Sequence, residues 1–177
     1  MLGIDLKEDV IAFCNGVAER SGFSGMRFVA GDIRKTPRDR SPHLVVSLHA
    51  CDIATDVVIN TAADLGARVI LSTPCCHRYL NGKVTANELS FVTRYPHLSN
   101  KLCEALTDSL RAARLRASGY SVTVCELTDP ENTPKNTLIR AIKKPCSGAE
   151  LERRRAEYDA ALAFIMGEGA KNYLQEI

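Results

Sequence analysis

Acidic, imidazole and thiol side chains are grouped at four places along this sequence, each directly after a short apolar run. Asp5 and Asp32 follow the first two runs, and the segments His49-Ala50-Cys51-Asp52 and Pro74-Cys75-Cys76-His77 follow the next two. A carboxylate accepts hydrogen bonds from two neighbouring hydroxyls. An imidazole with a pKa near about 6.5 is suited to general-base work. The sequence therefore offers groups that bind a polar ligand and groups that move a proton.

The segments between these groups alternate between short β-rich runs and longer helical patterns, which is typical of an α/β fold. Strands are expected at 2–5, 26–30, 44–48 and 68–71, and helices at 7–20, 54–65 and 101–117. Strands that are joined through helices run parallel, so their carboxyl ends share one edge of the sheet, where ligands of such sheets bind. We therefore expect the four groups to line one rim. The strand at 44–48 is almost wholly apolar, which predicts burial on both faces.

The C-terminal part of the chain predicts a different arrangement. Residues 120–127 and 137–142 have strand patterns separated by a short turn, which favours an antiparallel pair. The tail from Glu150 has a helical pattern. We expect one domain over residues 1–146 and, over 147–177, a helical extension packed on the same domain.

Composition limits the class of protein. The chain has 177 residues, 45% hydrophobic and 25% charged, with a formal net charge of +2, which fits a globular protein and excludes an overall polybasic one. No apolar run approaches the roughly 20 residues of a membrane helix, and no secretory signal is visible. The seven cysteines, an odd number, then predict reduced thiols and a cytoplasmic protein.

The thiols leave several interpretations open. Cys51, Cys75 and Cys76, with His49 and His77, form a sufficient ligand set for zinc by residue type. The spacing contains no second CxxC, and adjacent cysteines seldom bind one ion together. A cysteine with a lowered pKa, acting as nucleophile or redox group, is another alternative. The interpretation we favour is small buried thiols near a substrate pocket, with no metal site.

The motifs, taken in order, resemble a known family. They are Gly3-Ile4-Asp5-Leu6-Lys7, Gly31-Asp32, Ser47-Leu48-His49-Ala50-Cys51-Asp52 with Thr55-Asp56, Pro74-Cys75-Cys76-His77, and Thr133-Pro134-Lys135-Asn136 with Ile139-Arg140-Ala141. The set resembles the methyltransferase-domain family that carries HACD…TD and PCC signatures on a class I S-adenosylmethionine (SAM) methyltransferase fold, up to about Lys144. The resemblance implies a Rossmann-like sheet, mostly parallel with a C-terminal antiparallel hairpin, and SAM as cofactor.

The resemblance assigns cofactor contacts to two strand ends. Asp5 would accept hydrogen bonds from the ribose hydroxyls, and Leu6 would flank the adenine. Asp32 would accept a hydrogen bond from the adenine amino group, with Ile33 beside the ring. The alternatives are that Asp5 caps the following helix and that Asp32 is an ordinary turn residue.

The loop after the third strand carries the catalytic candidates. The resemblance places it where the methyl group meets its acceptor, so His49 is a candidate general base. Asp52 is a candidate for orienting the substrate or the SAM amino group. The alternatives are that Asp52 caps the next helix and that His49 hydrogen-bonds loop backbone.

The acceptor is expected to enter over the loop after the fourth strand. Cys75, Cys76 and His77 are the candidate substrate contacts there, and Lys135 could contact a phosphate, unless it only belongs to a turn. RNA and protein are both reasonable acceptors, and the sequence does not choose between them. The arginines of segments such as 111–116 either contact an RNA backbone or form a solvated helix face.

The sequence departs from the family in one respect. In class I methyltransferases a first strand and its Gly-rich loop precede the strand that ends in the ribose-binding acid, and here Asp5 is already that acid. We therefore expect a truncated domain whose sheet lacks that strand and loop, with an exposed edge open to self-association. This leaves two functions open: part of a methyltransferase, or a non-catalytic binding or assembly module that retains the fold.

Overall fold

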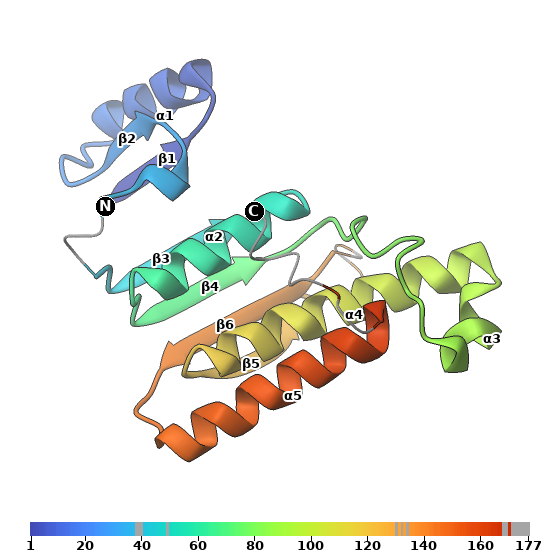
Figure 1. Ribbon diagram of the computed structural model, residues 1–177. Coiled ribbons are helices and arrows are strands. Elements are labelled where there is room, and N and C mark those ends of the chain that lie inside the picture. Colours follow the sequence, from blue (N-terminus) through green and yellow to red (C-terminus); the bar gives the residue numbers. More distant parts are fainter. Residues whose placement is uncertain are drawn as a thin grey trace. The chain divides into compact units, whose positions relative to one another are not determined.

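The structure is a computed structural model that describes residues 1–37, 41–48, 50–129, 131, 133, 135–167 and 170. The chain divides into two compact units, Met1–Arg40 and Ser41–Ile177 (Figure 1). Each unit is an α/β arrangement, which confirms the predicted fold class. His49, the candidate general base, lies outside the described residues.

Unit 1 is a β-α-β segment followed by one short turn of helix. It contains β1 (Leu2–Asp5), α1 (Glu8–Arg20), β2 (Arg27–Ala30) and the 3₁₀ helix η1 (Ile33–Lys35). β1 and β2 are parallel, with Asp5 beside Ala30. Two acidic residues in the first turn of α1 and Arg20 in its last suit the helix dipole.

The spacing of Val10, Phe13, Cys14 and Val17 predicts that they form the packing face of α1, but the structure buries a different face. Ile11 and Ala18 are its buried residues, whereas Phe13 is 68% exposed and Val10 and Val17 are also exposed. Asn15 Nδ2 donates to the Phe28 carbonyl and Asn15 Oδ1 accepts from the Phe28 amide, both at 2.9 Å. The side chain of a helix residue thereby satisfies backbone groups of β2.

The two strands of unit 1 approach closely at Gly3. A Cβ atom placed on Gly3 would lie 2.3 Å from Cδ1 of the Phe28 ring, closer than packed carbon atoms allow. The parallel pairing of β1 with β2 therefore depends on the missing side chain at this position.

We expect Gly3→Ala to lower the free energy of unfolding by about 1–3 kcal/mol, because the added methyl group must displace the ring. Urea denaturation followed by circular dichroism measures the effect. Gly25→Ala is the control, since a Cβ there meets nothing within 4 Å. In a Phe28→Ala background the Gly3 substitution should cost much less. Equal costs for Gly3→Ala and Gly25→Ala would contradict this packing.

Unit 2 is a four-stranded mixed sheet with helices. Its elements are β3 (Leu44–Leu48), α2 (Ile53–Asp64), β4 (Val69–Thr73), η2 (Asn87–Leu89), α3 (Ser90–Thr93), α4 (Pro96–Ala117), β5 (Tyr120–Glu126), β6 (Thr137–Lys143) and α5 (Gly148–Met166). The strand order is β3-β4-β6-β5. β3 and β4 are parallel, and β6 is antiparallel to both β4 and β5, which confirms the predicted C-terminal hairpin.

Helices α2 and α4 contact each other and the sheet, and α5 packs along α4 (Figure 1). The core between helices and sheet includes Ile59, Ile70, Leu115, Tyr120 and Ile139. The core between α4 and α5 includes Leu80, Leu110, Tyr158, Leu162 and Ile165. α4 therefore belongs to both cores and joins the sheet to α5.

Strand β3 is not buried on both faces, so that prediction is wrong. Leu44, Val46 and Leu48 alternate along one face and are about half or more exposed. α2 covers the other face, where Ser47 is buried. An apolar run shows that the strand can be buried, but it does not show that other elements cover both of its faces.

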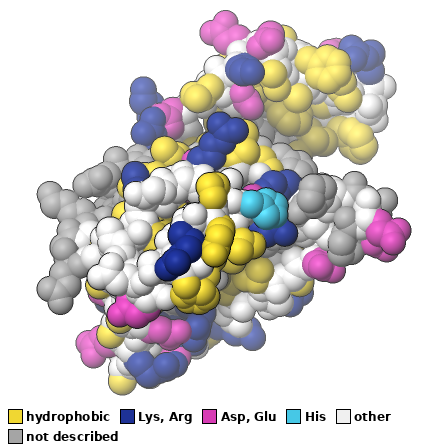
Figure 2. Space-filling view, turned by 90° about the vertical axis from the view of Figure 1, so that its right-hand side faces the viewer, with side chains coloured by type: hydrophobic (Ala, Val, Ile, Leu, Met, Phe, Trp, Pro, Cys, Tyr) yellow, Lys and Arg dark blue, Asp and Glu magenta, His cyan; other side chains and the backbone are white. Residues whose placement is uncertain are grey.

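Side chains of every kind reach the surface of the molecule. On the face shown in Figure 2, hydrophobic side chains lie in groups among basic and acidic ones. Within the described part of the chain, no helix has the length and apolar character needed to cross a membrane.

Candidate functional site

Asp5 and Asp32 lie at the carboxyl ends of two adjacent parallel strands, as the sequence predicts. The amide of Gly31 donates to the carbonyl of Asp5 at 2.9 Å, which fixes this strand end beside the turn that carries Asp32. Asp5 Oδ1 accepts from the amide of Lys7 at 2.9 Å and so stabilises the turn into α1. The carboxylate has further lone-pair positions for a ligand. Leu6 is 75% exposed.

Asp32 is fixed by its neighbour Arg34. Its Oδ1 accepts from the Arg34 amide at 2.9 Å, and its Oδ2 lies 2.6 Å from Arg34 Nη2. The hydrogen bonds from the Arg34 side chain and then from the Arg34 amide are the main cause that lowers the pKa of Asp32 to about 2. Ile33, between them, begins η1. Asp32 is thus a charged acceptor held in one orientation.

We expect Arg34→Gln to move the pKa of Asp32 up from about 2 toward its ordinary value of 3.8, because the side-chain hydrogen bonds and the nearby positive charge are lost. The pKa is measured by following the carboxyl chemical shifts by NMR from about pH 1.5 to about pH 6. Because the folded pKa is lowered, this pair stabilises the fold above about pH 3.8 and the effect is lost as the pH falls toward 2. An unchanged pKa in the variant would contradict the assignment.

The loops after β3 and β4 meet at one edge of unit 2. Leu48 pairs with Thr73 at the last register position of the two strands. Beyond it, the Sγ atom of Cys76 lies 3.9 Å from that of Cys51 and 3.7 Å from that of Cys75. The prediction that residues of the two motifs share a rim is therefore confirmed within this unit.

The thiols differ from the buried groups that the sequence favoured. Cys51 is exposed, and Cys75 and Cys76 are half-buried. The pKa of Cys75 is raised to about 11, mainly by burial and next by the hydrogen bond with Cys76. Cys75 on its own is therefore a neutral thiol near pH 7 and not an activated nucleophile.

Asp52 occupies the N-cap position of α2, but its side chain makes no capping hydrogen bond there. Its φ of 41° makes it the one non-glycine residue with positive φ among those described. Its Oδ1 is buried without a hydrogen-bond partner in the described part of the chain. A strained backbone and an unpaired buried oxygen are features of sites that act on a ligand.

The guanidinium of Arg111, in α4, donates hydrogen bonds to the loop that carries Asp52 and to the first turn of α2. The Arg111 side chain is fully buried and donates to both carboxylate oxygens of Asp56, at 2.7 and 3.0 Å. It also donates to the carbonyl of Asp52 at 2.9 Å and to Asp108 Oδ1 at 3.1 Å. Burial raises the pKa of the Asp56 carboxyl, and the hydrogen bonds from Arg111 offset part of that effect.

His77 joins the same network from the loop after β4. Its Nε2 lies 3.0 Å from Asp108 Oδ1, the oxygen that Arg111 also contacts. The His77 side chain is 4% exposed, and neither Nδ1 nor Nε2 has a partner with hydrogen-bond geometry among the described residues, so Asp108 lies at ion-pair distance from Nε2 without a hydrogen bond. Asp108 therefore links the PCC segment, through His77, to the HACD segment, through Arg111.

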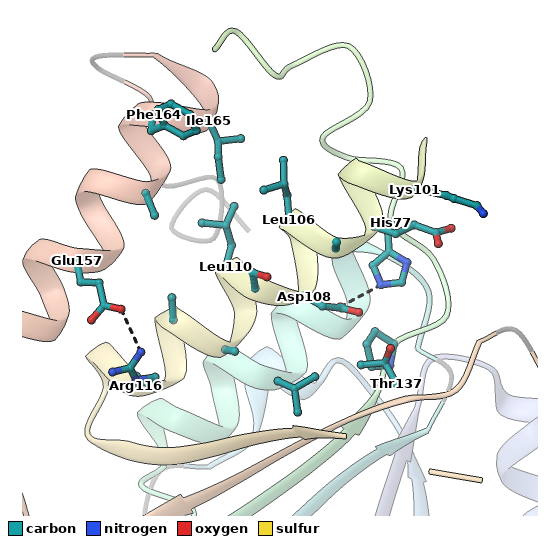
Figure 3. Close-up of a pocket in the computed structure, with 18 of the residues that line it drawn as sticks. His77, Lys101, Leu106, Asp108, Leu110, Arg116, Thr137, Glu157, Phe164 and Ile165 are labelled. Atoms are coloured by element: carbon teal, nitrogen blue, oxygen red, sulfur yellow. Dashed lines mark hydrogen bonds and ion pairs between the residues drawn. The ribbon is translucent and has the colours of Figure 1, made fainter. Parts of the chain in front are cut away.

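A cavity of about 840 Å³ opens beside His77 (Figure 3). Side chains of α4 and α5, including Leu106, Leu110 and Phe164, supply its apolar wall. Its polar lining includes Lys101, Glu104, Asp108, Arg116, Lys135, Thr137 and Glu157. The cavity thus has an apolar wall and a charged lining, as a site for a polar organic ligand requires.

Lys135 reaches the cavity from the segment before β6, where it forms an ion pair with Glu104. The neighbouring Asn136 accepts hydrogen bonds at its Oδ1 from the amides of Leu127 and Thr128, at 3.1 and 2.7 Å. Asn136 therefore connects the start of β6 to the segment that follows β5. Lys135 additionally brings a positive charge to the cavity that His77 lines.

Sequence reasoning missed Arg111, Asp108 and the burial of Asp56. It treated Arg111 as part of a phosphate-binding or solvated face, and that is wrong because the side chain is fully buried. Asp56 lies in the first turn of α2, and its partner Arg111 is 55 residues away in sequence. The available signal was the pair Asp108 and Arg111, spaced by three residues in one helix.

We expect Arg111→Met to lower the free energy of unfolding by about 3–5 kcal/mol, because it leaves the buried Asp56 carboxylate without its partner. Arg116→Met, on the same helix, is the control. Arg116 is 39% exposed in its pair with Glu157, so its loss should cost about 0–1 kcal/mol. Chemical denaturation measures both values, and similar costs for the two variants would refute the assigned role of Arg111.

Comparison with known proteins supports the motif-based resemblance. Residues 1–83 match a family model described as a methyltransferase domain. This stretch contains β1 through β4 and both the HACD and PCC segments. The match confirms the resemblance to a methyltransferase-domain family; the two signatures as family markers and the missing N-terminal part stay predictions.

The curated proteins with similar sequences are much longer than this chain. The chain is 29% identical over 119 residues to a mouse (Mus musculus) glutathione S-transferase C-terminal domain-containing protein. It is 28% identical to the human (Homo sapiens) protein of the same description. Each match covers 53% of this chain and 19% of the relative, so the chain spans about a fifth of the length of these relatives.

Three solved structures have partly similar architecture. The PH0226 protein of Pyrococcus horikoshii OT3 has a TM-score of 0.43 and 14% sequence identity, and the match covers 81% of this chain and 71% of that one. The YcgJ protein of Bacillus subtilis has a TM-score of 0.42 and 11% identity, and the match covers 99% of this chain and 70% of that one. The CMeT domain of the citrinin polyketide synthase has a TM-score of 0.41 and 18% identity, and the match covers 81% of this chain and 39% of that one.

Proposed function

We propose that this chain, whose first 83 residues match a methyltransferase domain, is part of a SAM-dependent methyltransferase that acts on RNA or protein. The match carries the proposal, because it spans the nucleoside-binding candidates Asp5 and Asp32 and the catalytic candidates His49 and Asp52. The geometry of the two units supports it residue by residue.

Unit 1 suits the nucleoside part of SAM. Asp5 and Asp32 stand at neighbouring strand ends, so one carboxylate can receive ribose hydroxyls while the other receives an amino group. Leu6 offers an exposed apolar side chain next to Asp5 for one side of the adenine, and Ile33 stands beside Asp32. The residues present therefore fit the group they are proposed to hold.

When bound, SAM supplies an electrophilic methyl group on a sulfonium, which an acceptor displaces in line. Such a transfer depends mainly on holding donor and acceptor in position. The Oδ1 of Asp52, which has no hydrogen-bond partner among the described residues, can orient an N–H or O–H donor. His49 stays our candidate for the base that takes the acceptor proton.

For the acceptor we propose the edge formed by Cys75, Cys76 and His77, together with Lys135. The buried Nδ1 of His77 has no hydrogen-bond partner among the described residues, so it can form a hydrogen bond with the substrate. Lys135 provides a positive charge toward a phosphate or carboxylate on the same ligand. Both residues line the cavity of unit 2.

Calorimetric titration of the whole chain with S-adenosylhomocysteine tests the proposal. We expect saturable binding that Asp5→Ala weakens by about 10–100-fold, the equivalent of about 1.5–3 kcal/mol for hydrogen bonds to a charged group. Glu8→Ala is the matched control, since Glu8 is an exposed acid in the first turn of α1.

Two results would count against the proposal. Absence of any saturable binding by the folded chain would favour the alternative of a non-catalytic binding or assembly module. Equal weakening by Asp5→Ala and Glu8→Ala would remove the assigned role of Asp5 as ribose acceptor.

A further inference from the structure

We propose that the thiolates of Cys51, Cys75 and Cys76 together bind one Zn²⁺ ion. Cys75 and Cys76 lie at the edge that we propose for the acceptor, but the proposed methyl transfer gives none of the three thiols a chemical step. Among the described residues they form one group whose three Sγ atoms all lie within 4.8 Å of one another. The proposal concerns a second, separate property of the chain and does not require SAM.

Two of the three sulfur–sulfur distances match those of a zinc–thiolate centre, and the third, between Cys51 and Cys75, is within 4.8 Å. Zinc binds thiolate at about 2.3 Å in tetrahedral geometry, which sets neighbouring sulfurs about 3.8 Å apart. The structure has 3.7 Å between Cys75 and Cys76 and 3.9 Å between Cys76 and Cys51. Cys76 thus stands between two partners at the distance that one shared ion requires.

The three sulfurs come from two loops that unit 2 already holds together. The Cys51 loop is fixed by a hydrogen bond from Thr55 Oγ1 to the carbonyl of Ala50 and by Arg111 at the carbonyl of Asp52. The Cys75 and Cys76 loop follows β4, which pairs directly with β3. The ligands are therefore positioned before an ion binds, so binding needs little reorganisation.

Adjacent cysteines seldom share an ion, and that was the sequence-level objection to a metal. The structure answers it, because Cys75 and Cys76 place their Sγ atoms 3.7 Å apart instead of pointing to opposite sides of the chain. The proposal therefore differs from the expectation, drawn from the sequence, that these thiols bind no metal.

On binding, each of the three S–H groups loses its proton to solvent and forms one Zn–S bond, which gives a centre of net charge −1. A water molecule completes the tetrahedron. His77 is next in sequence, but neither of its ring nitrogens lies within 4.8 Å of all three sulfurs, so it is not the fourth ligand in this arrangement. Cys51 is exposed, so an ion has a path to the site.

The test uses the full chain, stripped of metal and kept reduced, with free thiols counted before titration. Co²⁺ is added first, because tetrahedral thiolate coordination gives intense visible absorption, and Zn²⁺ is then used to displace it in competition with a chromophoric chelator. We expect one equivalent to bind. Cys76→Ser should weaken the affinity by about 100-fold or more, since it removes the central ligand.

Cys125→Ser is the matched control, because Cys125 is an exposed cysteine outside the group, and it should bind as the unaltered chain does. Should Cys76→Ser fail to fold by circular dichroism, Cys51→Ser gives the same test from an exposed position. The proposal is overturned if the reduced, folded chain binds no stoichiometric Zn²⁺. It is equally overturned if the substitutions in the group leave affinity unchanged, or if the thiols react only by disulfide formation.

Discussion

The buried contact between Arg111 and the carboxylates of Asp56 and Asp108 is the interaction on which the candidate site of unit 2 depends. Arg111 has no exposed side-chain surface, and burying a charge in this way is unfavourable unless its hydrogen bonds are satisfied. Here the guanidinium has two bonds to Asp56, one to Asp108 and one to the backbone of Asp52. Arg111, where α2 and α4 meet, thereby holds the loop after β3 directly and the loop after β4 through Asp108 and His77.

Strand direction explains why these loops meet at all. β3 and β4 are parallel, so the chain leaves both at the same edge, and β6 runs back antiparallel to β4, so it enters at that edge. The segment before β6 therefore brings Lys135 to the cavity that His77 lines from the end of β4. Three stretches that are far apart in sequence contribute to one rim because of sheet topology alone.

Much of this arrangement could be predicted from the sequence. The strands, the long helices, the hairpin and the position of Asp5 and Asp32 at neighbouring strand ends follow from periodicity and from the rule for parallel strands. These features are local, or they depend on strand order, so a single sequence contains enough information for them.

Other features depend on long-range packing, which a single sequence does not determine. Arg111 and Asp56 are 55 residues apart, and neither segment contains a pattern that identifies the other as its partner. The exposed Phe13 and Val46 occupy apolar patterns that predict burial, but whether an apolar face is covered depends on elements elsewhere. The thiol spacing likewise depends on how two loops turn after their strands.

The account rests on the claim that the Cys51 loop and the Cys76 loop lie against each other. A short bifunctional bimane reagent, applied to the reduced Cys75→Ser chain and followed by peptide mapping, measures this contact directly. The account predicts that the main cross-linked product joins Cys51 to Cys76, whose sulfurs lie 3.9 Å apart. A product that joins Cys51 chiefly to the exposed Cys125 or Cys146, or no product with Cys51, would contradict it.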